Sequence, residues 1–279
     1  MTHPSPSPLL YPLTRTGPPP SFEDNTLILP MVSVGSVPQL AVDLLLHSPA
    51  LALEKVARLD HSDCIPFAGP DEGAKGNAIS TALEVFQNRA GLTVIQHRSP
   101  VFKSREKAFT DRLVAWIRSA NFKQVLVLSS IDAAARTDDE LSTSVVTLFP
   151  APPRTPALQA LSTLYPPFEV RPPPQHLSAL SRSDQDSNGI PHIPGGGMTR
   201  RLLNAFAAAA APAAAAQTQA GGDVGALLLF CAEGDNRPDA ETLAHLVATC
   251  LQIDVEKPLQ HPPSWQGVFG APLDQAMYG

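Results

Sequence analysis

Residues 26–46, TLILPMVSVGSVPQLAVDLLL, decide the fold class of this chain. Residues 26–33 are mainly apolar and partly β-branched, which predicts a strand, although Pro30 predicts a break or an edge position within it. Gly35 ends this strand. A helix follows, because apolar residues recur with helical spacing on one face: Val37, Leu40, Ala41, Leu44 and Leu45. The opening unit is therefore a strand, a glycine turn and a helix.

The alternation of strands and helices continues outward from this unit. Further strands are expected at residues 52–59, 81–87, 92–96, 124–128, 145–149 and 224–231, with a hairpin turn at 88–91. Further helices are expected at residues 103–119, from 199, and from 236. The apolar run at 124–128, QVLVL, is typical of a strand that is buried on both faces. We therefore predict one α/β domain in three layers, a mainly parallel sheet with helices on both faces, similar to nucleoside phosphorylase/hydrolase-like folds.

The thirty prolines divide the chain into regions. They gather in residues 4–20, 150–175 and 258–263. From this we expect a disordered N-terminal tail over residues 1–24, an ordered domain over 25–270 and a flexible tail over 271–279. Irregular insertions are expected near 150–190 and near 205–222, where an alanine-rich helix frays into a loop.

Composition argues against several classes of partner and ligand. The formal net charge is −6, and no cluster of Lys and Arg is interleaved with aromatic residues, so nucleic acid and anionic membrane are not expected as partners. No apolar run approaches the roughly 20 residues that span a bilayer. The three cysteines, Cys64, Cys231 and Cys250, are far apart and suit buried positions in a reducing compartment. No Cys/His spacing predicts a metal site, and no cofactor is expected.

Three polar turns are candidates for chemistry. The first is the glycine loop at residues 193–199, IPGGGMT, which lacks the Gly-Lys-Ser/Thr ending of a phosphate-binding loop. The others are EGDN at 233–236 and Ser129-Ser130, which has no nucleophile elbow around it. Open α/β sheets bind ligands at such strand ends, so an enzyme of the nucleoside phosphorylase or hydrolase type is the alternative hypothesis. No histidine lies close in sequence to complete a catalytic pair, and structural turns explain all three segments, so no catalytic residue is assigned.

The last three residues differ from an ordinary terminus. Met277, Tyr278 and Gly279 present a hydrophobic residue, a tyrosine and one residue that carries the terminal carboxylate. Such a tail can enter a groove on a partner, where its carboxylate can pair with a lysine. We therefore assign Met277, Tyr278 and Gly279 as candidate partner-binding residues.

Several segments resemble a known family, the proteasome assembly chaperone 2 family. PMVSVGSVPQLAVDLLL (30–46), QVLVLSS (124–130), IPGGGMT (193–199), EGDNRPDA (233–240) and PPSW (262–265) occur there in the same order. Together they cover the chain from about residue 25 to 270. The glycine turn and the EGDN turn are the most specific of them.

This resemblance implies a binding protein rather than an enzyme. Members of the family have an α/β fold without catalytic equipment and pair with proteasome assembly chaperone 1. The heterodimer binds the α subunits of the 20S proteasome during core assembly, in the cytoplasm and nucleus. Some members end in a hydrophobic–Tyr–any-residue tail that inserts between adjacent α subunits. Met277, Tyr278 and Gly279 match that pattern.

Overall fold

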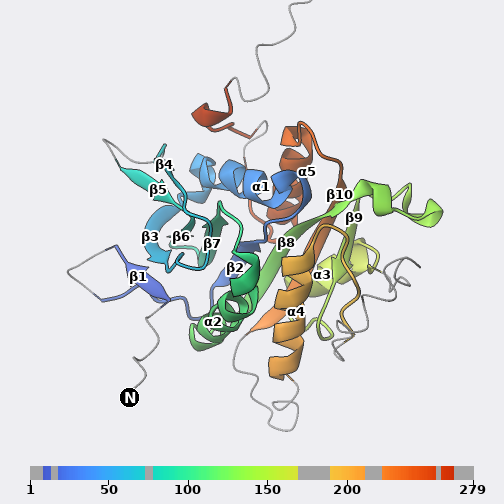
Figure 1. The fold of residues 1–279 in the computed structure, drawn as a ribbon, viewed down its shortest axis with the longest axis horizontal. Coiled ribbons are helices and arrows are strands. Elements are labelled where there is room, and N and C mark those ends of the chain that lie inside the picture. The colour runs from blue at the N-terminus through green and yellow to red at the C-terminus, as the bar shows by residue number, and fades with distance from the viewer. Residues whose placement is uncertain are drawn as a thin grey trace, which may run out of the picture.

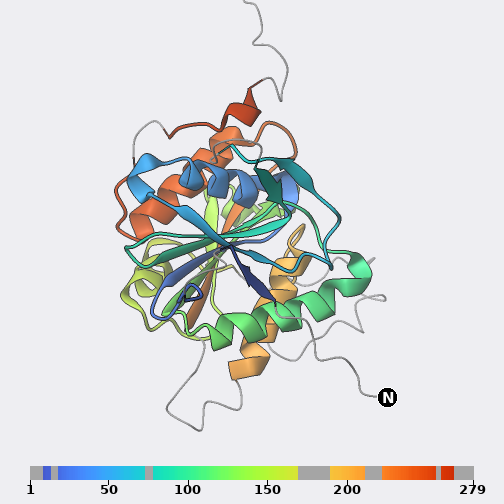
Figure 2. The ribbon, with the colours of Figure 1, turned by 90° about the vertical axis from the view of Figure 1, so that its left-hand side faces the viewer.

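The computed structural model describes residues 9–13, 18–72, 78–168, 189–210, 222–255 and 259–266. An eight-stranded sheet in the order β1-β3-β6-β7-β2-β8-β10-β9 lies between two layers of helices (Figures 1 and 2). Its strands are β1 (Leu10–Pro12), β2 (Thr26–Pro30), β3 (Glu54–Leu59), β6 (Leu83–Gln87), β7 (Leu92–His97), β8 (Gln124–Asp132), β9 (Val145–Leu148) and β10 (Asp223–Cys231). A separate two-stranded ribbon consists of β4 (Ala68–Pro70) and β5 (Ile79–Thr81).

The centre of the sheet is parallel and its flanks are antiparallel. Strands β7, β2, β8 and β10 run parallel to one another. Strands β1, β3 and β6 continue the sheet on one side as antiparallel neighbours, and β9 does so on the other. The predicted fold class is confirmed, with parallel pairing confined to these four central strands. The predicted hairpin is also confirmed, because β6 and β7 pair antiparallel on either side of residues 88–91.

Two hydrophobic cores lie on opposite faces of the sheet. Successive residues of β8 alternate between them, since Val125 and Val127 belong to one core and Leu126 and Leu128 to the other. The first core is covered by α2 (Glu106–Ser119) and α4 (Gly197–Ala210). The second is covered by α1 (Val37–Leu46), α3 (Pro156–Leu164) and α5 (Arg237–Cys250). The three layers are seen edge-on in Figure 2.

The structure differs from the sequence-based expectations in three places. Strand β1 lies in the expected disordered tail, and Leu9 and Phe22 belong to the first core, so long-range pairing orders residues that look irregular in sequence. Helix α3 lies in the expected insertion 150–190, beginning at Pro156 in the first helical position, where the missing N–H costs nothing. Strand β2 ends at Pro30 and not at Ser33, and it is a central strand, so the break predicted from Pro30 is observed and the edge position is not.

Candidate functional site

The carboxyl ends of β2, β8 and β10 meet at one edge of the sheet, where the three candidate turns converge. The hydroxyl of Ser130 donates to the carbonyl of Val34 and lies 2.8 Å from the hydroxyl of Ser33. The thiol of Cys231 donates to the same Val34 carbonyl at 3.3 Å. Residues from three strand ends therefore bond to one another across the edge.

The glycine loop packs against this edge. Gly195 has φ +75°, and a Cβ built on it would lie 2.0 Å from Cγ2 of Val34. The hydroxyls of Ser129 and Thr199 lie 2.7 Å apart and are fully buried. The loop thus uses its glycine for a left-handed turn and close approach to a neighbouring segment, as the structural interpretation expects.

The EGDN turn is held by contacts with its own neighbours. Asn236 is buried, donates from Nδ2 to the carbonyl of Gly234 at 3.2 Å, and lies against Gly35. Asp235 is exposed and pairs with Arg237, whose hydrogen bond holds the pKa of Asp235 below its ordinary value. The two carboxylates of this turn, on Glu233 and Asp235, are exposed to solvent.

These contacts define what the strand-end edge can do. The enzyme hypothesis requires an open polar pocket there with a convergent His or Arg, whereas Ser129, Ser130 and Asn236 are buried against the chain's own turns. In the described ranges, no three His, Cys, Asp or Glu side chains are placed to hold a metal ion. No helix within those ranges is long and apolar enough to cross a bilayer. Ser129, Ser130 and Asn236 therefore contribute to the packing of this edge.

His97 lies next to a cysteine, as the histidine of a catalytic Cys–His pair does. Its Nε2 lies 4.0 Å from the sulfur of Cys64, and its ring stacks at a tilt on Phe109. Burial lowers the pKa of His97 to about 4, and burial raises the pKa of the Cys64 thiol to about 12. Both groups are therefore neutral near pH 7, and the thiolate that a cysteine nucleophile needs is disfavoured.

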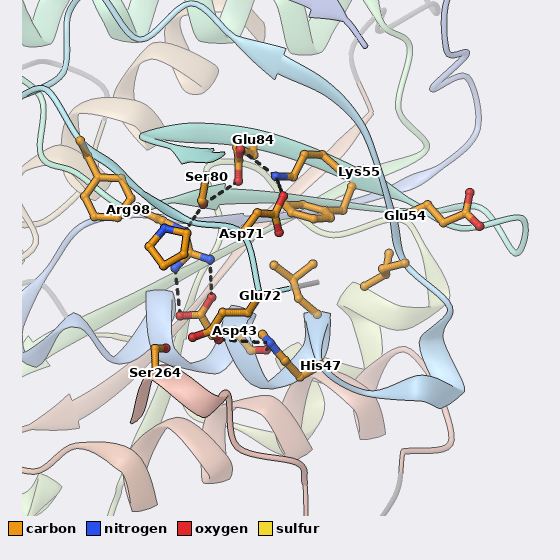
Figure 3. A pocket seen from close by; sticks show the side chains of 16 residues that line it. Asp43, His47, Glu54, Lys55, Asp71, Glu72, Ser80, Glu84, Arg98 and Ser264 are labelled. Carbon is orange, nitrogen blue, oxygen red and sulfur yellow. Dashed lines mark hydrogen bonds and ion pairs between the residues drawn. The ribbon is translucent and has the colours of Figure 1, made fainter. Parts of the chain in front are cut away.

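A hollow of about 450 Å³, which we call the acidic hollow, lies beside the carboxyl end of α1 (Figure 3). It lies between the end of α1, strands β3 and β6, and the β4–β5 ribbon. Its lining residues are Asp43, Leu46, His47, Leu53, Glu54, Lys55, Phe67, Gly69, Pro70, Asp71, Glu72, Ser80, Glu84, Phe86, Arg98 and Ser264.

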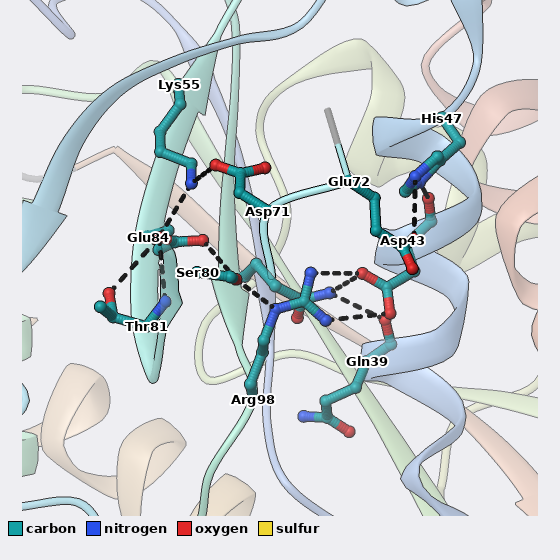
Figure 4. A network of polar contacts seen from close by, with 11 residues as sticks. Gln39, Asp43, His47, Lys55, Asp71, Glu72, Ser80, Thr81, Glu84 and Arg98 are labelled. Atoms are coloured by element: carbon teal, nitrogen blue, oxygen red, sulfur yellow. Dashed lines mark hydrogen bonds and ion pairs between the residues drawn. The ribbon is translucent and has the colours of Figure 1, made fainter. Parts of the chain in front are cut away.

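Two buried carboxylates anchor the polar contacts of the acidic hollow (Figure 4). Glu84 accepts hydrogen bonds from Lys55 at 3.0 Å and from the hydroxyl of Ser80 at 2.9 Å. Asp43 accepts from Arg98, whose Nη2 lies 2.9 Å from Oδ1. Arg98, directly after β7, also donates from Nε to Ser80 at 3.1 Å, so one continuous network joins α1 to β3, β5 and β6.

The outer contacts of the network hold the end of the ribbon. Asp71, directly after β4, pairs with Lys55. Its neighbour Glu72 lies 3.5 Å from Nε2 of His47, a contact that is ionic only when the imidazole is protonated. The ribbon is thereby fastened to both β3 and α1.

The sequence-predicted site and the acidic hollow consist of different residues. Met277, Tyr278 and Gly279 lie outside the described residues. The acidic hollow was missed by sequence reasoning, because its charged residues are separated by long stretches of sequence and form no motif. A pair such as Asp43 and Arg98 becomes recognisable only when α1 and β7 are adjacent.

Comparison with known proteins places the chain in a family. A family model described as the PAC2 family matches residues 27–261. Proteasome assembly chaperone 2 of Danio rerio is 33% identical over 281 residues, covering 93% of this chain and 96% of that protein. The protein of the same name from Xenopus tropicalis is 34% identical, covering 91% and 95% of the two chains.

Solved structures agree on the fold. The crystal structure of Pyrococcus furiosus PbaA, an archaeal homologue of proteasome-assembly chaperone, aligns with a TM-score of 0.58 at 14% identity. The alignment covers 89% of this chain and 88% of PbaA. At that identity the likeness concerns the fold alone, whereas the family match and the full-length relatives carry the assignment. The chain belongs to the PAC2 family.

Proposed function

We propose that this protein is a chaperone for assembly of the 20S proteasome core. The observation that carries the proposal is identity of 33–34% with two proteins named proteasome assembly chaperone 2, over more than nine-tenths of each chain.

The proposed role is binding without catalysis. The packing of the strand-end edge supports it, since the hydroxyl of Ser130 and the thiol of Cys231 donate hydrogen bonds to the carbonyl of Val34. In this proposal the protein pairs with proteasome assembly chaperone 1, and the heterodimer binds the outer face of the α-ring in the cytoplasm and nucleus. Met277 and Tyr278 insert between adjacent α subunits, and the carboxylate of Gly279 pairs there with a lysine.

The test is a co-purification with and without the last three residues. The tagged chain is co-expressed with proteasome assembly chaperone 1, and the complex is offered to purified 20S particles. We expect both interactions with the full chain, and loss of 20S binding alone when residues 277–279 are deleted. Tyr278→Ala should behave like the deletion, while Met277→Leu, which keeps a hydrophobic side chain, should retain binding.

The outcomes separate the parts of the proposal. Unchanged 20S binding after the deletion refutes the role of the tail and leaves the chaperone role standing. Failure of the full chain to recover either partner refutes the chaperone role itself. In that case nucleosides and phosphate would be tested as ligands by calorimetry.

A further inference from the structure

The acidic hollow carries an excess of negative charge. Five carboxylates line it, against the ammonium of Lys55 and the guanidinium of Arg98, which gives a net charge of −3 with His47 neutral. Glu84 and Asp43 accept hydrogen bonds from Lys55, Ser80 and Arg98 within the internal network. Glu72, by contrast, faces His47 at 3.5 Å. Among the described residues, the negative charges that line the hollow therefore outnumber the positive ones, and the resulting potential favours a cation that enters it.

The walls of the acidic hollow suit the stem of a long side chain. Leu46, Leu53 and Phe86 contribute apolar surface beneath the charged groups. Lysine and arginine have aliphatic stems that pack on such surface while the charged head reaches a carboxylate. At the rim, Phe67 is 39% exposed, and Ile65, two residues before it, is 45% exposed. Exposed apolar residues beside a charged hollow are typical of a protein-binding surface, where a basic anchor is surrounded by contacts that exclude water.

The end of the described chain lies at the same hollow. Ser264, in the 3₁₀ helix Pro263–Trp265, lines it beside Asp43 (Figure 3). Trp265 is buried in the second core and fixes this segment. The described chain ends one residue later, at Gln266, so residues 267–279 start from the rim of the hollow. Thirteen extended residues span at most about 45 Å, so a partner that the tail binds can also reach this face.

The residues after Gln266 are themselves a poor occupant for the hollow. Residues 267–279, GVFGAPLDQAMYG, contain no Lys, Arg or His, and they bring Asp274 and the carboxylate of Gly279. Two more negative charges would be repelled by the carboxylates that line it. A basic side chain of another molecule fits the hollow better.

We propose that the acidic hollow binds a lysine or arginine side chain on the outer face of the proteasome α-ring, next to the site that receives the tail. This inference rests on the proposed function, because tail binding to the α-ring is what brings that surface to the hollow. The tail then supplies one contact and the hollow a second on the same partner. Two linked contacts bind more tightly than either alone, since the second forms at high effective concentration.

The experiment removes charge from the hollow while leaving the two buried ion pairs of its network in place. Glu54→Gln/Glu72→Gln takes away two carboxylates that are outside the buried Asp43–Arg98 and Glu84–Lys55 contacts. Asp111→Asn/Glu23→Gln is the matched control, with the same change of charge at exposed positions on or beside α2 across the sheet. Each variant is prepared as the complex with proteasome assembly chaperone 1, and its binding to 20S particles is measured at low and high salt.

We expect the hollow variant to bind 20S particles about three- to tenfold more weakly than the control at low salt. The difference should shrink in high salt, where exposed charges are screened. Glu72→Lys, which reverses one charge, should weaken binding further. Equal affinities for the hollow variant and the control, in a complex whose binding still depends on residues 277–279, overturn this inference alone. Loss of proteasome assembly chaperone 1 instead of the 20S particle also overturns it. Absence of 20S binding by the unmodified complex refutes the proposed function.

Discussion

Gly195→Ala should destabilise the protein strongly, while Gly197→Ala two residues later should not. At Gly195, φ is +75°, and an L-residue in that left-handed region costs about 1–2 kcal/mol. The new methyl group would also lie 2.0 Å from Cγ2 of Val34. Val34 cannot move away freely, because its carbonyl accepts from Ser130 and Cys231. Relief of such overlap in a packed region costs about 1–3 kcal/mol, so the free energy of unfolding should fall by about 2–5 kcal/mol.

The control residue has neither problem. Gly197 begins α4, has no positive φ, and has open space where a Cβ would be. Alanine there restricts the unfolded chain and favours the helix, so Gly197→Ala should be neutral or stabilising by up to about 1 kcal/mol.

Urea unfolding of the two variants and the parent protein measures the difference. The midpoint of Gly195→Ala should fall while the slope with denaturant stays the same, since the native surface is unchanged. If Gly195→Ala and Gly197→Ala unfold within about 0.5 kcal/mol of each other, the close contact between the glycine loop and Val34 is refuted. The glycine loop would then not be closely packed against the strand-end edge.

Three further predictions concern buried polar groups. Arg98→Met removes the cation that pairs with the Asp43 carboxylate, so the free energy of unfolding measured in urea should fall by about 3 kcal/mol. Arg98→Met/Asp43→Leu should restore most of this loss, and no recovery would contradict the pairing. His97 has a folded-state pKa of about 4 against about 6.5 unfolded, so its contribution to stability is complete above pH 6.5 and lost as the pH falls toward 4, by up to about 3 kcal/mol. His97→Gln should reduce this pH dependence of unfolding, and an unchanged profile would count against burial of a neutral imidazole. Burial raises the pKa of Cys64 to about 12 and of Cys250 to about 11, so iodoacetamide at pH 8 should label these thiols only after unfolding, as mass spectrometry can check.

Local patterns were sufficient to predict the central elements of the fold. The helical face that includes Leu44 and the apolar run of β8 follow directly from side-chain periodicity, and so does β10. The turn at residues 88–91 was also readable, because Asn88 caps it by accepting from the N–H groups of Ala90 and Leu92. These elements depend on neighbours in sequence, and the sequence therefore specifies them well.

Elements that depend on distant partners could not be predicted in the same way. Strand β1 is Leu-Tyr-Pro beside other prolines, and it is a strand only because β3 pairs with it. The ribbon strand β4, Ala-Gly-Pro, has little β-propensity and is held by β5 and by the Asp71–Lys55 contact. The acidic hollow is lined in part by β4 and β5. It could not be predicted from the sequence for the same reason.

The position of β10 has a consequence for synthesis of the chain. Among the described strands it is the last in sequence, yet it lies inside the sheet, between β8 and β9. A nascent chain that has not yet released residues 223–231 from the ribosome leaves the apolar edge of β8 and the edge of β9 both unpaired. Such edges invite pairing with other chains. The domain therefore cannot close strand by strand during translation, and the incomplete chain needs protection from aggregation until its final strand is inserted.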